Sequence, residues 1–277
     1  MRMLTRLCGS IPEPLKAPFR RFAGRPHLHG IEWRDRRLLE SSERYVPGTF
    51  PLFGKPFAYA DSASFLSAHE EIFVRGIYSF RSDSDRPFII DGGANVGLAT
   101  LFFKRQYPAA EVLALEADPL IAEVLERNIG SFGLGGVELR REALWDRGGT
   151  VRFAADGADG GRAGESEEAG FEVPAVRLSE VIGERRVDLL KLDIEGAETR
   201  VLVEAETALA RVERLFVEYH APSGKPGSLS ALLAVLERSG FRTYLEQTCV
   251  FLRRPLLDEA ATGPFESQIN VFGWRCK

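Results

Sequence analysis

Six polar residues stand at the ends of predicted strands, where they could take part in chemistry, and five of them are acidic. They are Asp91, Glu116, Glu142, Asp193, Glu218 and His220. Open α/β sheets bind ligands beyond the carboxyl ends of their strands, so we expect these side chains to face one crevice. Because carboxylates repel phosphate groups, this set favours a cationic or hydroxyl-rich ligand over a diphosphate.

A glycine-rich turn leads into this crevice. The segment RPFIIDGGANVGLATLFF, residues 86–103, places three glycines within six residues between a strand-like run and a run with helical spacing. Glycine is needed where φ is positive or where a ligand touches the backbone. The spacing Asp-Gly-Gly-x-Asn-x-Gly differs from GxGxxG, and the turn has no phosphate-loop lysine. The turn alone therefore does not identify the ligand.

Glu116 closes the next predicted strand, 25 residues after Asp91. A carboxylate at this place can accept hydrogen bonds from both vicinal hydroxyls of a ribose. The alternative is a solvated loop glutamate. Since the apolar run 111–115 delivers Glu116 to the crevice, we interpret it as a ribose ligand.

Strands and helices alternate along the chain. We predict a helix over 62–80 and then strands ending at Asp91 and spanning 111–116, 137–142, 187–193 and 214–220. Helices are predicted from Leu98, from Asp118-Pro119 to Asn128, and over 197–210 and 229–240. This alternation implies a parallel sheet covered on both faces. The segments 241–247 and 267–276 have no helix between them and predict a terminal antiparallel pair.

One low-complexity patch interrupts this pattern. The segment AADGADGGRAGESEEAG, residues 154–170, lies between the strand-like segments TVRF and FEVPAVRL. Its glycine, alanine and acidic residues predict a long mobile hairpin loop.

Composition narrows the class of protein. The 277 residues are 44% hydrophobic and carry a formal net charge of −4, which suits a buried core and argues against a broad nucleic-acid-binding surface. Three widely spaced cysteines without a CxxC pair favour a reducing cytoplasm over a disulfide framework or a zinc site. Neither a signal peptide nor a membrane span is predicted, because prolines interrupt the basic N-terminal segment and no apolar run reaches membrane length.

The basic charge is concentrated near the N-terminus. Residues 1–37 hold nine Lys or Arg against three Asp or Glu. The simplest interpretation is a solvated, partly disordered arm. The alternatives are an arm that docks on an acidic partner, folds over the active site or mediates homo-oligomerisation.

The ordered motifs resemble a known family. FIIDGGANVGLATLFF, VLALEADP with Asn128 one helix later, LLKLDIEGAE and LFVEYH are similar to the FkbM family of class I S-adenosylmethionine-dependent methyltransferases. The resemblance covers residues 60–275 and includes EEIFVRGIYSF upstream. It implies a Rossmann-like α/β fold with a seven-stranded, mostly parallel sheet, one antiparallel strand and helices on both faces. We therefore predict an N-terminal arm or cap at 1–60 and a methyltransferase domain at 61–277.

The resemblance also implies S-adenosyl-L-methionine as cofactor. The glycine loop would bear on its methionine and ribose end, Glu116 on the ribose hydroxyls, and Glu142-Ala143 on the adenine. Asp193 would lie near the amino group or the transferred methyl, and Tyr78 is either a lid or a core aromatic. The predicted cofactor-binding residues are Tyr78, Asp91, Gly92, Gly93, Ala94, Asn95, Gly97, Glu116, Ala117, Glu142, Ala143 and Asp193.

The predicted catalytic residues are His220, Asp193 and Glu218. A hydroxyl acceptor loses its proton as it is methylated, so a general base helps, and His220 is the best placed of the four histidines. A structural role at the strand end is its alternative. The same three residues, with Glu195 and Glu198, could instead hold a divalent metal such as Mg²⁺ and chelate a vicinal diol. We favour a reaction without metal.

The expected activity is O-methylation of a hydroxyl on a small-molecule natural product or sugar, in the cytoplasm. N-methylation is an alternative, although DIEG at 193–196 stands where base-amino methyltransferases have an Asn/Asp-Pro-Pro-Tyr turn. A non-catalytic scaffold is another, and the intact Asp91, Gly93 and Glu116 count against it. A nicotinamide oxidoreductase would have to bind a pyrophosphate beside several carboxylates.

Overall fold

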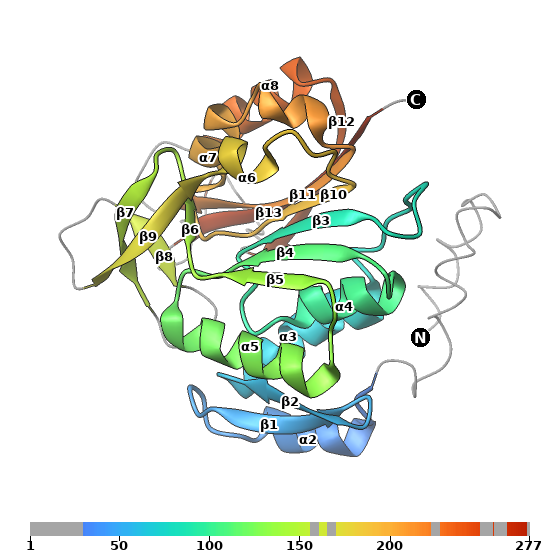
Figure 1. Ribbon diagram of the computed structural model, residues 1–277. Helices are drawn as coiled ribbons and strands as arrows, with labels where there is room; N and C mark the ends of the chain where they lie inside the picture. Colours follow the sequence, from blue (N-terminus) through green and yellow to red (C-terminus); the bar gives the residue numbers. More distant parts are fainter. Residues whose placement is uncertain are drawn as a thin grey trace. The chain divides into compact units, whose positions relative to one another are not determined.

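The computed structural model describes residues 30–155, 161–164, 170–222, 228–249, 257 and 265–275. The chain divides into two compact units, the first ending at Ser79 and the second beginning at Phe80 (Figure 1). We predicted that the methyltransferase domain begins at residue 61. Residues 61–79 instead belong to the first unit, because their contacts group them with the N-terminal elements. Within the described ranges, no helix is both long and apolar enough to cross a lipid bilayer.

The N-terminal unit contains helix α2 (Trp33–Glu40), a hairpin of β1 (Gly48–Leu52) and β2 (Lys55–Tyr59), and helix α3 (Ser62–His69). The Asp61 carboxylate begins α3 by accepting a hydrogen bond from the Ser64 backbone N–H at 2.9 Å. The prediction of one helix over 62–80 is too long. The chain continues past His69 only as a π-helix, η3 (Glu70–Arg75), which Gly76 ends with a φ of 71°.

The second unit is built on a seven-stranded sheet with the order β12-β13-β11-β10-β3-β4-β5. Its strands are β3 (Phe88–Gly92), β4 (Glu111–Leu115), β5 (Val137–Arg140), β10 (Leu189–Leu192), β11 (Arg214–Pro222), β12 (Phe241–Cys249) and β13 (Phe265–Arg275). Only β13 runs against its neighbours. The chain leaves β3 toward β5 and returns to β10 on the other side, so the strand order reverses between β3 and β10. Ligands bind at such a reversal.

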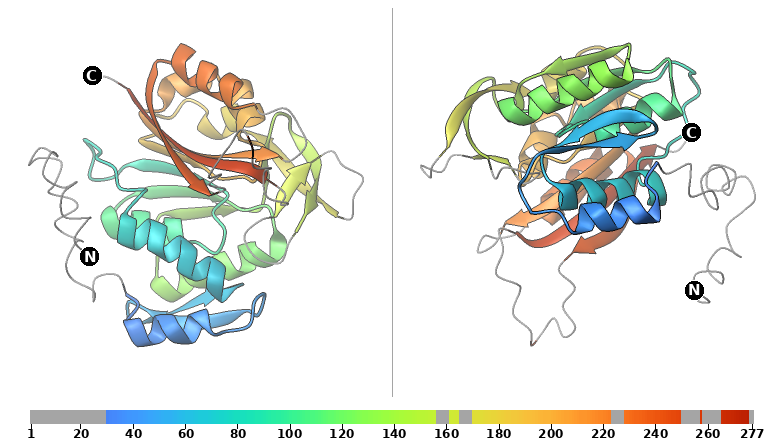
Figure 2. Two further views of the ribbon diagram at one scale, coloured as in Figure 1. Left: turned by 180° about the vertical axis from the view of Figure 1, so that it is seen from behind. Right: turned by 90° about the horizontal axis from the view of Figure 1, so that it is seen from below.

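Helices cover both faces of this sheet (Figures 1 and 2). One face carries α4 (Leu98–Gln106) and α5 (Pro119–Phe132), and the other carries α6 (Leu178–Ile182), α7 (Glu198–Glu204) and α8 (Leu229–Arg238). The central strands are buried on both sides, which explains their continuous apolar runs. The predicted α/β fold, with a seven-stranded mostly parallel sheet and one antiparallel strand, is confirmed.

Two helix predictions can be compared in detail. The N-cap of α5 is confirmed, because the Asp118 carboxylate accepts a hydrogen bond from the Leu120 N–H at 2.8 Å and Pro119 follows it. The helix predicted over 197–210 is too long, since α7 ends at Glu204 and a separate 3₁₀ turn, η4 (Ala208–Arg211), follows.

A second sheet is inserted between β5 and β10. Its order is β6-β9-β7-β8, with β6 (Ala143–Trp145), β7 (Gly149–Ala154), β8 (Arg162–Gly164) and β9 (Phe171–Arg177). The strands predicted on either side of the low-complexity patch are confirmed. The prediction of one long loop over 154–170 is wrong at 162–164, where β8 pairs with β7. Residues 156–160 and 165–169 lie outside the described ranges.

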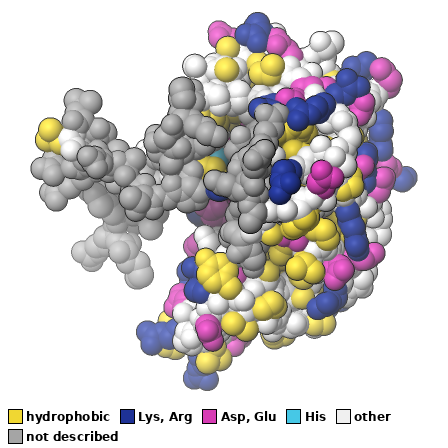
Figure 3. All heavy atoms as spheres, turned by 90° about the vertical axis from the view of Figure 1, so that its left-hand side faces the viewer, with side chains coloured by type: hydrophobic (Ala, Val, Ile, Leu, Met, Phe, Trp, Pro, Cys, Tyr) yellow, Lys and Arg dark blue, Asp and Glu magenta, His cyan; other side chains and the backbone are white. Residues whose placement is uncertain are grey.

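Charge is mixed on the face shown in Figure 3. Among the described residues there, Lys and Arg side chains are interspersed with Asp and Glu rather than gathered into one patch. The described side chains of that face therefore form no broad basic patch of the kind that nucleic-acid backbones need.

Candidate active site

The loop between β3 and α4 runs very close to the end of β10. Gly93 has a φ of 72°, and a Cβ built there would lie 1.8 Å from the carbonyl oxygen of Asp193. The backbone N–H groups of Gly93 and Ala94 donate to the Leu115 carbonyl at 3.0 and 2.9 Å. The loop is thus held against the ends of β4 and β10, and only glycine fits at position 93.

Helix α5 holds the other side of this loop. Gly97 has a φ of 90°, and a Cβ there would lie 2.4 Å from Leu125 Cδ1. The buried Asn128 side chain donates from Nδ2 to the Val96 carbonyl at 2.8 Å. This contact explains why the sequence motif includes an asparagine one helix beyond Glu116.

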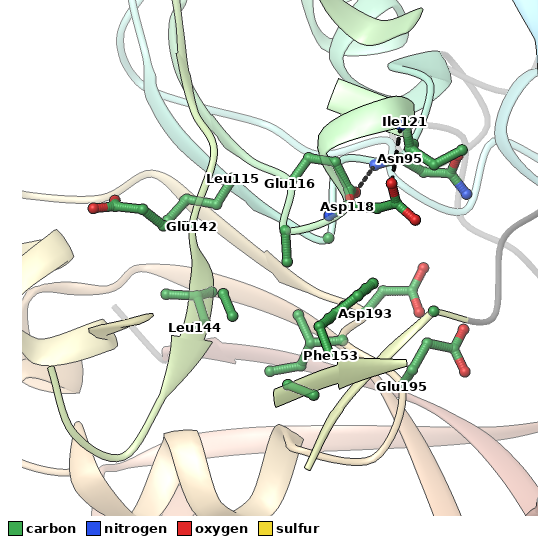
Figure 4. Close-up of a pocket in the computed structure, with 16 residues that line it drawn as sticks. Asn95, Leu115, Glu116, Asp118, Ile121, Glu142, Leu144, Phe153, Asp193 and Glu195 are labelled. Carbon is green, nitrogen blue, oxygen red and sulfur yellow. Dashed lines mark hydrogen bonds between the residues drawn. The ribbon is translucent and has the colours of Figure 1, made fainter. Parts of the chain in front are cut away.

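Glu116 is buried at the end of β4 and is fixed by two backbone groups (Figure 4). Its Oε2 accepts a hydrogen bond from the Asn95 N–H at 2.8 Å, and its Oε1 accepts one from the Asp118 N–H at 2.9 Å. Each oxygen keeps acceptor capacity for a ligand. Burial raises the pKa of Glu116 to about 7, although both hydrogen bonds oppose that rise.

A hollow opens beside Glu116, between the loop, the ends of β4, β6 and β10, and the inserted sheet (Figure 4). It contains about 670 Å³ of empty space, its open mouth included. Its lining residues are Gly93, Asn95, Leu115, Glu116, Ala117, Asp118, Ile121, Glu142, Ala143, Leu144, Phe153, Gly161, Ala163, Asp193, Ile194 and Glu195. This lining combines apolar side chains with several carboxylates, as a ligand with an apolar part, hydroxyl groups and positive charge would require.

His220 is buried in β11, and carboxylates of the segment that follows β10 surround its ring. His220 Nδ1 is 3.1 Å from Glu198 Oε1, and His220 Nε2 is 3.5 Å from Glu195 Oε2. The same Glu198 oxygen accepts hydrogen bonds from the Ile194 and Gly196 N–H groups at 3.2 and 2.9 Å. Glu198 therefore fixes both the imidazole and the loop that carries Glu195, whose φ is 55°.

This arrangement shifts the acid–base behaviour of the histidine. Burial opposes the charged form, but the Glu198 hydrogen bond and the charges of Glu198, Glu195 and Asp193 outweigh it and raise the pKa of His220 to about 10. Burial also raises the pKa of Glu195 to about 8. The surrounding carboxylates therefore favour the charged form of His220.

The sequence matches a known family of proteins. The family model described as Methyltransferase FkbM domain matches residues 91–243, more than half of the chain, from Asp91 in the glycine loop to β12. The chain belongs to the FkbM methyltransferase family.

Relatives of this FkbM methyltransferase share a fourth to a third of its residues where they align. Methyltransferase sdnD of Sordaria araneosa is 32% identical over 211 residues, covering 62% of this chain and 80% of that protein. The 31-O-demethyl-FK506 methyltransferase FkbM of Streptomyces tacrolimicus is 29% identical over 231 residues, covering 69% and 86%. The 2-O-methyltransferase NoeI of Sinorhizobium fredii is 25% identical over 173 residues, covering 54% and 70%.

The structure of this FkbM methyltransferase brings most of the predicted cofactor-binding residues to the hollow. Those that line it are Gly93, Asn95, Glu116, Ala117, Glu142, Ala143 and Asp193. Ala94 and Gly97 belong to the loop after β3, whereas Asp91 and Gly92 are the last two residues of β3. None of these four residues is part of the lining. Asp91 is fully buried and accepts a hydrogen bond from Thr100 Oγ1 at 2.7 Å. Tyr78 belongs to the N-terminal unit, so its role as a lid stays a prediction.

Of the three predicted catalytic residues, one lines the hollow and two do not. Asp193 lines the hollow, whereas His220 and Glu218 do not. His220 reaches the hollow through Glu195, which lines it and contacts Nε2. Possible metal-binding atoms of Asp193, Glu195 and His220 lie within 4.8 Å of one another, and Glu218 is not part of this group.

Sequence reasoning missed two residues of this FkbM methyltransferase site. Phe153 in β7 lines the hollow, and the ammonium group of Lys191 in β10 donates a hydrogen bond to the Gly93 carbonyl of the glycine loop. Phe153 lies in a short alternating strand, TVRF, that gave no functional signal. Lys191 stands two residues before Asp193 in the LLKLDIEGAE motif, and a lysine inside a buried strand is the signal that could have pointed to it.

Proposed function

We propose that this protein transfers a methyl group from S-adenosylmethionine to a hydroxyl group of a small-molecule natural product or sugar. The observation that carries the proposal is the place of Glu116. Its carboxylate follows β4, the strand next to β3 and thus beside the reversal of strand order, and it is bonded to Asn95 of the glycine loop. An acidic residue in this position suits the vicinal hydroxyls of a ribose.

The residues present fit this cofactor. Gly93 lets the loop pack against the Asp193 carbonyl, and this packing brings the loop backbone to the wall of the hollow. Both Glu116 oxygens keep acceptor capacity for ribose hydroxyls, and Glu142 and Ala143 line the same hollow. The Asp193 carboxylate also lines the hollow, and its charge favours the amino group and the sulfonium of the cofactor.

The cofactor supplies a methyl group that is already activated by the positive charge of its sulfur. The protein mainly aligns the acceptor with that methyl in a water-poor pocket. We propose His220 as the general base that takes the hydroxyl proton, with Glu195 linking it to the hollow and Glu198 holding its Nδ1. This chemistry needs no metal, and the cluster of Asp193, Glu195 and His220 serves proton transfer in our proposal.

Oxygen is the proposed methyl acceptor for two reasons. The names of two relatives, the 31-O-demethyl-FK506 methyltransferase and the 2-O-methyltransferase, refer to oxygen positions. Carboxylates such as Asp118 and Glu195 line the hollow, and they accept hydrogen bonds from hydroxyl groups. Natural products and sugars are rich in such groups.

Replacing Glu116 with glutamine is expected to weaken cofactor binding roughly 10- to 100-fold, because charge-assisted hydrogen bonds to the ribose are lost. Glutamine keeps the shape and an acceptor oxygen for one backbone N–H. Since ribose binding needs the carboxylate, wild-type affinity should rise as the pH is raised through the Glu116 pKa of about 7, and the variant should lack this rise. Titration calorimetry at several pH values measures both. Equal affinities in the two proteins would remove Glu116 from the binding site.

Replacing Phe153 with alanine is expected to weaken cofactor binding about 10-fold, because the variant loses an aromatic wall of the hollow. Phe171 gives a matched control. Its ring lies 5.8 Å from that of Phe153, but it is not part of the lining and is 40% exposed. The Phe171→Ala variant should bind the cofactor almost as the wild type does. If both variants bind equally, the Phe153 ring has no part in binding the cofactor.

The proposed activity is tested by incubating the purified protein with methyl-labelled S-adenosylmethionine and a panel of hydroxylated metabolites. We expect label on a hydroxyl oxygen of at least one compound, with loss of the product in Glu116→Gln. Label on an amine nitrogen would correct the acceptor class. Cofactor binding without transfer to any class of compound would favour a binding protein that keeps the fold.

A further inference from the structure

A buried lysine lies beneath the proposed cofactor loop. Lys191 is in β10, between β3 and β11, and it stands opposite Asp91 of β3 in register. Its side chain is only 3% exposed. Because burying a charge is costly unless it is paired, such a lysine needs an explanation in its contacts.

The ammonium group of Lys191 joins three parts of the site. It donates to the Gly93 carbonyl at 2.5 Å and lies 3.3 Å from the Gly92 carbonyl. It lies 3.4 Å from Asp91 Oδ1 and 3.5 Å from Asp193 Oδ2. One cation thus contacts the loop backbone, the carboxylate under the loop, and the carboxylate that lines the hollow.

The partners of Lys191 depend on it to different degrees. Asp91 Oδ2 accepts a hydrogen bond from Thr100, whereas the buried Oδ1 has no hydrogen-bond partner among the described residues and lies 3.4 Å from Lys191 Nζ. Asp193 is partly exposed, and only its Oδ2 is paired with Lys191. Lys191 therefore neutralises Asp91 and also sets the orientation of Asp193.

Charge on Lys191 persists despite its burial. Burial alone would lower its pKa, but the charges of Asp193, Asp91 and Glu218 outweigh burial and raise it. The cation is thus a permanent part of the site at neutral pH.

We propose that Lys191 is a positioning residue that holds Asp193 and the Gly92–Gly93 backbone in the arrangement that receives the amino-acid end of the cofactor. This inference rests on the proposed function. The loop after Gly93 is held by other bonds, from the Ala94 N–H to the Leu115 carbonyl and from the Asn95 N–H to Glu116. Loss of Lys191 should therefore affect the amino-acid end more than the nucleoside end.

The test compares two probes and three variants. S-adenosylhomocysteine carries the amino-acid end, and 5′-methylthioadenosine lacks it. Because Lys191→Met alone leaves Asp91 buried and unpaired, the main variant is Lys191→Met/Asp91→Asn, which removes both charges together. Asp193→Asn is a second variant, at a partly exposed position where folding is not at risk. Lys104→Met is the matched control, since Lys104 is also buried and donates to a carbonyl, that of Ala110 at 2.6 Å, but does not line the hollow.

Calorimetry should show S-adenosylhomocysteine binding at least about 10-fold more weakly to the double variant and to Asp193→Asn. Binding of 5′-methylthioadenosine should change by less than about 3-fold, and Lys104→Met should bind both probes as the wild type does. Wild-type affinity for S-adenosylhomocysteine in the double variant or in Asp193→Asn would overturn the inference, as would an equal loss for both probes. If the wild type binds neither probe, the proposed function itself fails.

Discussion

Replacing Gly93 with alanine is expected to abolish measurable cofactor binding and to lower the free energy of unfolding by about 2–4 kcal/mol. The added Cβ would lie 1.8 Å from the Asp193 carbonyl oxygen, and the φ of 72° disfavours any residue with a Cβ. Either the loop or the end of β10 must move, and both carry residues of the site. Calorimetric binding and thermal unfolding measure the two effects.

Gly130 gives the matched control for this substitution. It lies within α5, and a Cβ there would meet nothing within 4 Å. The Gly130→Ala variant should keep full cofactor affinity and gain about 0.5–1 kcal/mol of stability, because alanine favours a helix over glycine. A Gly93→Ala protein that binds the cofactor as tightly as Gly130→Ala does would show that the close packing of the loop on the end of β10 is not needed for binding.

Replacing His220 with alanine is expected to lower turnover roughly 100-fold or more, while cofactor affinity stays nearly unchanged. The reason is the loss of the general base, since His220 does not line the hollow and reaches it through Glu195. Single-turnover methyl transfer and calorimetry separate the two quantities. Wild-type turnover in this variant would leave His220 a purely structural role.

The pH dependence of kcat/KM should follow the titration of His220. A base must be neutral to accept a proton, and the pKa of His220 is raised to about 10, so kcat/KM should rise with pH from neutrality toward pH 10. In Glu198→Gln the carboxylate charge is lost but the shape is kept, and the inflection should move down toward the ordinary histidine value of about 6.5. The charged histidine also stabilises the folded state below its ordinary pKa, and this contribution is lost as the pH rises through about 10. An inflection at the same pH in both proteins would assign the profile to another group.

The features that sequence reasoning predicted well are local in the chain. The glycine loop, the N-cap at Asp118 and the acidic residue after β4 each depend on a few neighbouring residues, and the structure has all three. The seven-stranded, mostly parallel sheet with one antiparallel strand followed from the alternation of strands and helices together with the family resemblance.

The features that it missed depend on contacts between distant segments. Strand β8 is three residues long within a glycine-rich and acidic stretch, and it forms because β7 offers an edge to pair with. Its close approach needs Gly161, where a Cβ would lie 2.7 Å from the Phe153 ring. A strand of three residues is too short to show a periodic pattern in the sequence.

The contacts among His220, Glu195 and Glu198 also depend on segments that are distant in the chain. His220 was predicted from its place at a strand end, but its pairing with Glu198, 22 residues away, depends on how α7 packs against β11. Glu195 reaches Nε2 only because its backbone takes a positive φ of 55°. Residue types and spacing predicted the members of this cluster, and the geometry assigns their partners.

Titration of the purified chain with S-adenosylmethionine tests the central claim most directly. The hollow beside Glu116 should bind one molecule per chain with a dissociation constant in the micromolar range, and Gly93→Ala should remove the heat of binding. A wild-type protein that gives no heat and no thermal stabilisation at saturating S-adenosylmethionine would contradict the account.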